Sequence, residues 1–122
     1  MTIAYWCVLA LVFFPPVLGA MAKSGGFDNS RPREALAAAT GWRKRADWAQ
    51  QNALENFAPF AAAVIIGHLT GLAQGTLDQL ALAFVALRVL HAVFYIADQA
   101  TLRSVAYVGG LACIIAIFVM AA

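Results

Sequence analysis

The chain reads as four long apolar segments joined by polar stretches, of which only the one after the first segment is long. Each segment approaches the ~20 residues that an α-helix needs to cross the hydrocarbon core of a bilayer. None alternates apolar and polar residues with period two, so a membrane β-barrel is disfavoured. We therefore predict an all-α integral membrane protein, a four-transmembrane-helix bundle forming one domain over residues 1–122. The expected helices cover about 3–22, 46–73, 77–97 and 102–121.

Residues 23–45 form the long polar connection, which we expect to be a loop with a short helix near 34–40 ended by Gly41. Six of the eight Lys and Arg residues lie in this connection: Lys23, Arg31, Arg33, Arg43, Lys44 and Arg45. By the positive-inside rule, the loop is then cytoplasmic and both termini lie on the opposite side of the membrane. The first segment has no charge before Lys23, so we expect a retained helix and not a cleaved signal peptide.

The composition supports a membrane protein and excludes other classes. Hydrophobic residues make up 63% of the chain and charged residues 11%, against roughly a quarter charged in soluble domains. The basic residues are few and no aromatic or glycine-rich RNA motif accompanies them, so we expect no nucleic-acid partner. Cys7 and Cys113 lie in apolar runs, where free cysteine is an apolar packing residue.

The third and fourth segments carry polar residues that are costly in lipid. Arg88, His91 and Tyr95 fall at i, i+3 and i+7, on one face of a helix. An arginine near a helix centre costs ~2.5–3.5 kcal/mol on insertion scales, so Arg88 must find a partner inside the protein. Glu55 in the second segment is the expected partner. Arg88 is then either a device that sets helix register or part of a ligand site.

The second segment carries Asn52, Glu55 and Pro59 at the same spacing of i, i+3 and i+7. Asn52 is either a helix cap or a ligand contact. His91 is either a hydrogen-bonded core histidine or a ligand contact, and no second ligand at metal spacing accompanies it, so we expect no metal site. His68, at the far end of the segment, is expected to be an interfacial residue beside a helix contact.

Arg103 stands at the start of the fourth helix, where exposed amides, the helix dipole and a guanidinium together favour an anion. Ser104 and Tyr107 add hydroxyl donors beside it. A thiolate is one such anion, because nearby cations lower the pKa of a thiol. Cys7 and Cys113 lie elsewhere in the sequence, so the thiol must come from another molecule.

These motifs resemble the MAPEG family, the membrane-associated proteins of eicosanoid and glutathione metabolism. Arg88-x-x-His91-x-x-x-Tyr95 followed by Leu102-Arg103-Ser104-Val105-x-Tyr107 is similar to the family's third and fourth helices, and Asn52-x-x-Glu55-x-x-x-Pro59-Phe60 to its second. The resemblance implies a homotrimer that binds glutathione between subunits near the cytoplasmic side. It assigns glutathione binding to Asn52, Glu55, Arg88, His91, Tyr95 and Tyr107, and stabilisation of the thiolate to Arg103 and Ser104.

The resemblance also implies an activity: a glutathione S-transferase or peroxidase acting on a hydrophobic small molecule that enters from the membrane lipid. We expect a bacterial-type member in an inner membrane. Two departures reduce positive charge near the site, namely Gln51 where some members have arginine, and Asp98, which ends the third helix or caps the fourth. The alternative function is a non-catalytic membrane subunit whose polar clusters fix the oligomer. A small transporter or proton relay is a weaker alternative.

Overall fold

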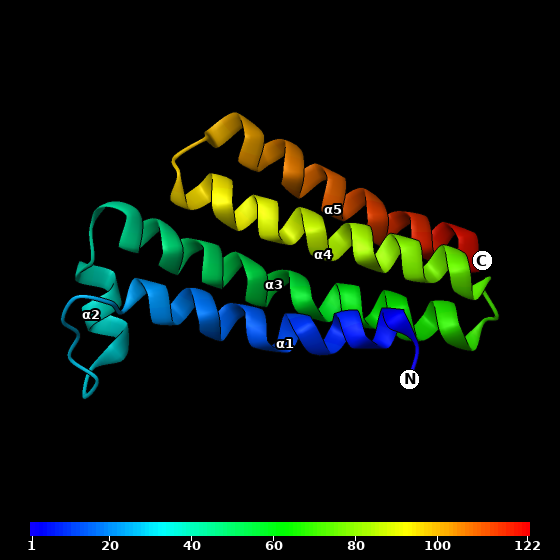
Figure 1. The fold of residues 1–122 in the computed structure, drawn as a ribbon, viewed down its shortest axis with the longest axis horizontal. Helices are drawn as coiled ribbons and strands as arrows, with labels where there is room; N and C mark the ends of the chain where they lie inside the picture. Colours follow the sequence, from blue (N-terminus) through cyan, green and yellow to red (C-terminus); the bar gives the residue numbers. More distant parts are fainter.

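The computed structural model describes residues 1–122, and α-helix is its main regular structure. Four long helices lie side by side in an elongated bundle, and a short helix lies at one end (Figure 1). The helices are α1 (Ile3–Ala22), α2 (Pro32–Ala38), α3 (Gly41–Leu69), α4 (Gln74–Ile96) and α5 (Ala100–Ala121). α1 packs mainly on α3, α5 packs mainly on α4, and α3 contacts α4. Both termini lie at the end of the bundle away from α2 (Figure 1).

The all-helical membrane fold is confirmed, with three helices that have the length and composition to span a bilayer: α1, α4 and α5. α3 is longer, at 29 residues, but it is not among these three. Its first turns carry a run of charges, and Asn52, Glu55 and Asn56 follow in its middle. Of these residues, Asn52 gives α3 its part in the candidate site described below.

The connection after α1 contains the short helix expected near 34–40, shifted two residues toward the N-terminus. α2 begins at Pro32, a residue favoured in the first helical turn, and ends at Ala38. The Lys44 ammonium donates to the carbonyls of Leu36 (2.9 Å) and Ala37 (3.2 Å), so that these carbonyls at the C-terminal end of α2 have hydrogen-bond partners. Gly41, at φ 63°, is the first residue of α3. The expected start at 46 is wrong because nothing from Trp42 onward breaks a helix, and polar residues extend it beyond the apolar segment.

The turn between α3 and α4 lies earlier in the chain than expected, at residues 70–73 and not 74–76, because α3 ends at Leu69 and not at 73. Gly71 has φ 80°, a left-handed conformation that glycine adopts without steric cost. α4 then begins at Gln74, three residues before the expected start. The turn is short because the left-handed residue reverses the chain immediately after the last turn of α3.

The turn between α4 and α5 is formed by Asp98, which has φ 60°. The Gln99 N–H donates to the Phe94 carbonyl (2.8 Å), the bond that closes a left-handed helix end. The Arg45 Nε, from α3, donates to the Ile96 carbonyl (3.0 Å) and ties this end of α4 to α3. Of the two roles expected for Asp98, the structure selects the end of α4. α5 begins at Ala100, two residues before the expected start.

The main hydrophobic core lies between α1, α3, α4 and α5, in the half of the bundle toward the termini. The rings of Phe60 and Phe84 stack there with centroids 4.2 Å apart. Cys7 and Cys113 are free, buried and part of this core, as the sequence predicts. Gly67 permits the close packing expected around it, since a Cβ there would come within 3.1 Å of Ile117. The polar residues of the candidate site lie beyond this core, toward α2.

Candidate functional site

An open groove of about 330 Å³ lies on the surface of α3, α4 and α5 at the end of the bundle near α2. Residues from all three helices line it: Asn52, His91, Tyr95, Arg103, Ser104, Tyr107 and Val108. The helical spacing explains the convergence, because His91 and Tyr95 are one turn apart on α4, and Arg103 and Tyr107 are one turn apart on α5. The structure therefore brings six of the eight predicted site residues to one place. Arg88 and Glu55 are not among its lining residues.

Arg103 contributes a cation to the groove. Its guanidinium carbon lies 4.4 Å from the centroid of the Tyr95 ring, a cation–π contact that fixes its position. The two salt bridges of the chain involve other residues, Arg31 with Glu34 and Lys44 with Asp47. Its backbone N–H already donates within the helix, to Gln99 (2.9 Å). The guanidinium donors of Arg103 are thus held in place and have no acceptor within the chain.

His91 forms the inner wall of the groove. Only 3% of its surface is exposed, and its Nδ1 is shielded from solvent with no hydrogen-bond partner. Its ring lies 5.6 Å from that of Tyr95 and 6.2 Å from that of Tyr107, measured between centroids. His91 is therefore not the hydrogen-bonded core histidine of the alternative interpretation. An unpaired nitrogen at this depth is unusual, because buried polar atoms are normally paired.

Arg88 is buried behind the groove, with 3% of its surface exposed. It donates from Nη2 to the side-chain oxygen of Asn52. The expected partner was Glu55, which is exposed. The prediction is wrong because successive residues turn by about 100°. Asn52 and Asn56, one turn apart, face α4, whereas Glu55 is rotated away from that contact.

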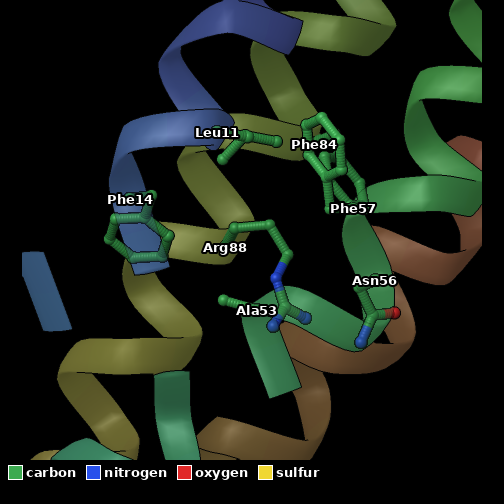
Figure 2. A pocket seen from close by; sticks show the side chains of 7 residues that line it. All are labelled: Leu11, Phe14, Ala53, Asn56, Phe57, Phe84 and Arg88. Atoms are coloured by element: carbon green, nitrogen blue, oxygen red, sulfur yellow. The ribbon is translucent and has the colours of Figure 1, made fainter. Parts of the chain in front are cut away.

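Arg88 also lines a small cavity of about 10 Å³, roughly the size of one water molecule. Figure 2 shows its side chain extending from α4 toward Ala53 and Asn56 on α3. Leu11 and Phe14 of α1, together with Phe57 and Phe84, form the apolar walls. The guanidinium is therefore enclosed by the protein, as an arginine in a membrane segment must be.

Comparison with known proteins identifies the family of the chain. The model of the MAPEG family matches residues 2–122. The chain belongs to the MAPEG family. No curated protein and no solved structure matches it. The family is membrane-associated and includes glutathione transferases and related membrane proteins.

The two departures from the MAPEG pattern, Gln51 and Asp98, and the nearby cation Arg45 all have structural roles outside the groove in this member. Gln51 is exposed and donates to the Asp47 carboxylate (3.1 Å), one turn back on α3. Arg45 donates to the end of α4, so it does not line the groove. Asp98 shapes the turn before Arg103. None of these three supplies a cation to the groove.

Two residues at or beside the groove, Asn56 and Val108, were not predicted from the sequence. Asn56 donates from Nδ2 to the Asn52 carbonyl (2.9 Å) and to its side-chain oxygen (3.3 Å). The spacing Asn52-x-x-x-Asn56 is a signal that could have revealed this contact. Val108 lines the groove next to Tyr107, and no sequence signal separates it from the other apolar residues of α5.

Proposed function

We propose that this MAPEG protein is a glutathione-dependent transferase or peroxidase that acts on lipophilic electrophiles or hydroperoxides. One observation carries the proposal: Arg103 is held in the groove with guanidinium donors that have no acceptor within the chain. A guanidinium held against a groove in an apolar protein favours an anionic ligand. Ser104 and Tyr107 place hydroxyl groups in the same groove.

The other lining groups fit glutathione, which carries carboxylates, amide carbonyls and a thiol. No acidic residue lines the groove, and Asn52, His91 and Tyr95 offer polar groups along it. His91 lines the groove, and Nε2, the ring nitrogen that is not shielded from solvent, is the one that it offers to a ligand. We assign glutathione binding to these three residues together with Tyr107. When bound, glutathione supplies the sulfur nucleophile.

Arg103 and Ser104 are the proposed catalytic residues. The guanidinium of Arg103 favours the thiolate over the thiol, which raises the fraction of the reactive form. The Ser104 hydroxyl is a second donor to the sulfur. Because both are preorganised at the start of α5, they stabilise the developing charge without reorganisation during the reaction.

The second substrate is proposed to reach the groove from the lipid. Exposed apolar side chains of α5 adjoin the groove, with Val105 64% and Val108 62% exposed. Val108 also lines the groove, so an apolar path joins the outer face of α5 to Ser104. A hydrophobic molecule dissolved in the bilayer would follow this path without crossing water.

The same proposal includes the assembly: a homotrimer of subunits in which α3 is the fourth span, in a bacterial inner membrane. Glu55 supports it, since this carboxylate is exposed on α3 and forms no salt bridge within the subunit. A neighbouring subunit or glutathione would provide its partner. The cations between α1 and the first turn of α3 favour a cytoplasmic position for α2, with both termini on the other side.

The alternative, a non-catalytic subunit, is favoured by a different contact. The Arg88–Asn52 hydrogen bond joins α4 to α3 within one subunit, as a device that sets helix register would. This contact accounts for Arg88 but gives no reason for the free donors of Arg103. The two functions therefore differ in what they predict for the groove.

Glutathione binding to the detergent-solubilised protein tests the proposal. We expect the thermal midpoint to rise with glutathione concentration, since a ligand at 100 times its Kd adds about 2.7 kcal/mol to stability. S-methylglutathione, which lacks the ionisable thiol, is the matched control and should shift the midpoint less. An unchanged midpoint at millimolar glutathione would refute the proposal and favour the non-catalytic subunit. Chemical crosslinking in the same detergent tests the trimer.

A further inference from the structure

We infer that Arg88 is a positioning residue: it orients the Asn52 side chain so that the amide NH2 faces the groove. The groove wall at Asn52 then binds an oxygen acceptor of the ligand, a carboxylate or carbonyl. This inference rests on the proposed function, because it concerns the same groove. It gives the buried arginine a role and makes the Asn52 end of the groove a hydrogen-bond donor.

The orientation follows from the chemistry of the guanidinium. Arginine carries only donors, so the Asn52 atom that meets its Nη2 must be the amide oxygen. Asn56 also donates to that same oxygen (3.3 Å). With two donors on it, the oxygen is fully used. The NH2 group of Asn52 forms no hydrogen bond within the chain and remains available.

The surroundings of Arg88 keep this arrangement in place. The guanidinium is buried, and Leu11, Phe57 and Phe84 surround it with apolar side chains. A flipped Asn52 would place its NH2 against the donor of Arg88, which would leave the buried guanidinium without its acceptor. Asn52 borders the groove and Arg88 does not, so Arg88 acts on a ligand only through Asn52.

The donor at Asn52 restricts which ligand groups can bind at this end of the groove. The Asn52 donor and the Arg103 cation lie in one groove that no carboxylate lines. A ligand group with lone pairs is favoured at Asn52, and an ammonium group is disfavoured there. For glutathione, we therefore place a carboxylate or an amide carbonyl at Asn52 and keep its ammonium group away from this wall.

The first test replaces Asn52 with its isostere, Asn52→Asp. The carboxylate keeps an oxygen toward Arg88 but turns a second oxygen, a negative acceptor, toward the groove. We expect the Kd for glutathione to rise by about 10-fold or more. The circular dichroism spectrum and elution volume should not change. Unchanged affinity in Asn52→Asp would overturn the inference while the proposed function stands.

The second test is a double-mutant cycle that separates positioning from a general structural effect. Arg88→Met should weaken glutathione binding several-fold in the wild-type background, and Arg88→Lys, which retains a donor, should restore part of it. In an Asn52→Ala background, Arg88→Met should have no further effect on Kd. A loss of equal size in both backgrounds would show that Arg88 acts on the fold and would overturn the inference. If the wild-type protein binds no glutathione, the proposed function falls and this inference with it.

Discussion

Two polar clusters lie at opposite ends of this apolar bundle, and they differ in how their hydrogen bonds are satisfied. At the end with the termini, the Asp78 carboxylate accepts from the Ala4 N–H (2.9 Å) and from the Gln74 side chain (2.6 Å). Gln74 also contacts His68, with 3.3 Å between Oε1 and Nδ1. This cluster joins the start of α1 to the turn between α3 and α4, and the chain itself supplies its partners.

The cluster at the groove is satisfied only in part. Arg88 and Asn52 pair with each other behind the groove. The Arg103 guanidinium has no acceptor within the chain, and His91 Nδ1 is buried without a partner. Polar groups in lipid need partners. The Asp78 cluster, whose partners lie within the chain, is thus a structural joint, whereas the unpaired groups of the groove are consistent with the binding site that we propose.

The largest effect that would sharpen this comparison is expected for Arg103→Ala. Loss of the cation should lower kcat/KM for glutathione conjugation to a model aryl halide by about 100- to 1,000-fold, the range for removing one preorganised donor. The thermal midpoint without ligand should fall only slightly, because the cation–π contact with Tyr95 is lost but no salt bridge is broken. Arg103→Lys is the matched control and should keep part of the activity. Full activity in the alanine variant would rule out the thiolate role.

Asp78→Ala should have the next largest effect, on stability and not on binding. It removes the acceptor of the Ala4 N–H and of Gln74, so we expect the free energy of unfolding to fall by about 2 kcal/mol. Denaturant titration in detergent measures it, with Asp78→Asn as the milder control that keeps an acceptor. A fall in glutathione affinity without a fall in stability would contradict the structural role of the Asp78 cluster.

The two histidines provide a matched pair. His91→Phe removes both ring nitrogens from a residue that lines the groove, so we expect about 10-fold weaker glutathione binding with no loss of stability, since Nδ1 has no partner to lose. His68→Phe, at the other end, should leave the affinity unchanged. Isothermal titration calorimetry measures the glutathione affinity of both variants. An equal loss of affinity in both would contradict a binding role for His91 and a structural role for His68.

The smallest effect concerns the turns at the two ends. The turn at the end with the termini has glycine in the left-handed position, Gly71, whereas the turn beside the groove has Asp98 there. Asp98→Gly should raise the free energy of unfolding by about 0.5–1 kcal/mol, because glycine adopts positive φ without a Cβ clash. Thermal denaturation checks this, and a lower midpoint would show that the Asp98 side chain itself holds the turn.

Helical periodicity and residue chemistry predicted much of the site. Arg88-x-x-His91-x-x-x-Tyr95 and Arg103-x-x-x-Tyr107 could be placed on helix faces because each helix has a fixed turn per residue. His91, Tyr95, Arg103 and Tyr107 do converge on the groove. The same logic failed for Glu55, because spacing along one helix does not say at which angle that helix faces its neighbour.

The helical membrane fold, the polar faces and the motifs of the MAPEG family could all be read from the amino-acid sequence, because they depend on local spacing and on the cost of polar groups in lipid. Only the tertiary structure decided that Arg88 bonds Asn52 and that Arg45 ties α3 to the end of α4. Both contacts join residues at least 36 positions apart. Their pairing depends on how α3 and α4 are rotated and shifted against each other, which the packing of all four long helices sets.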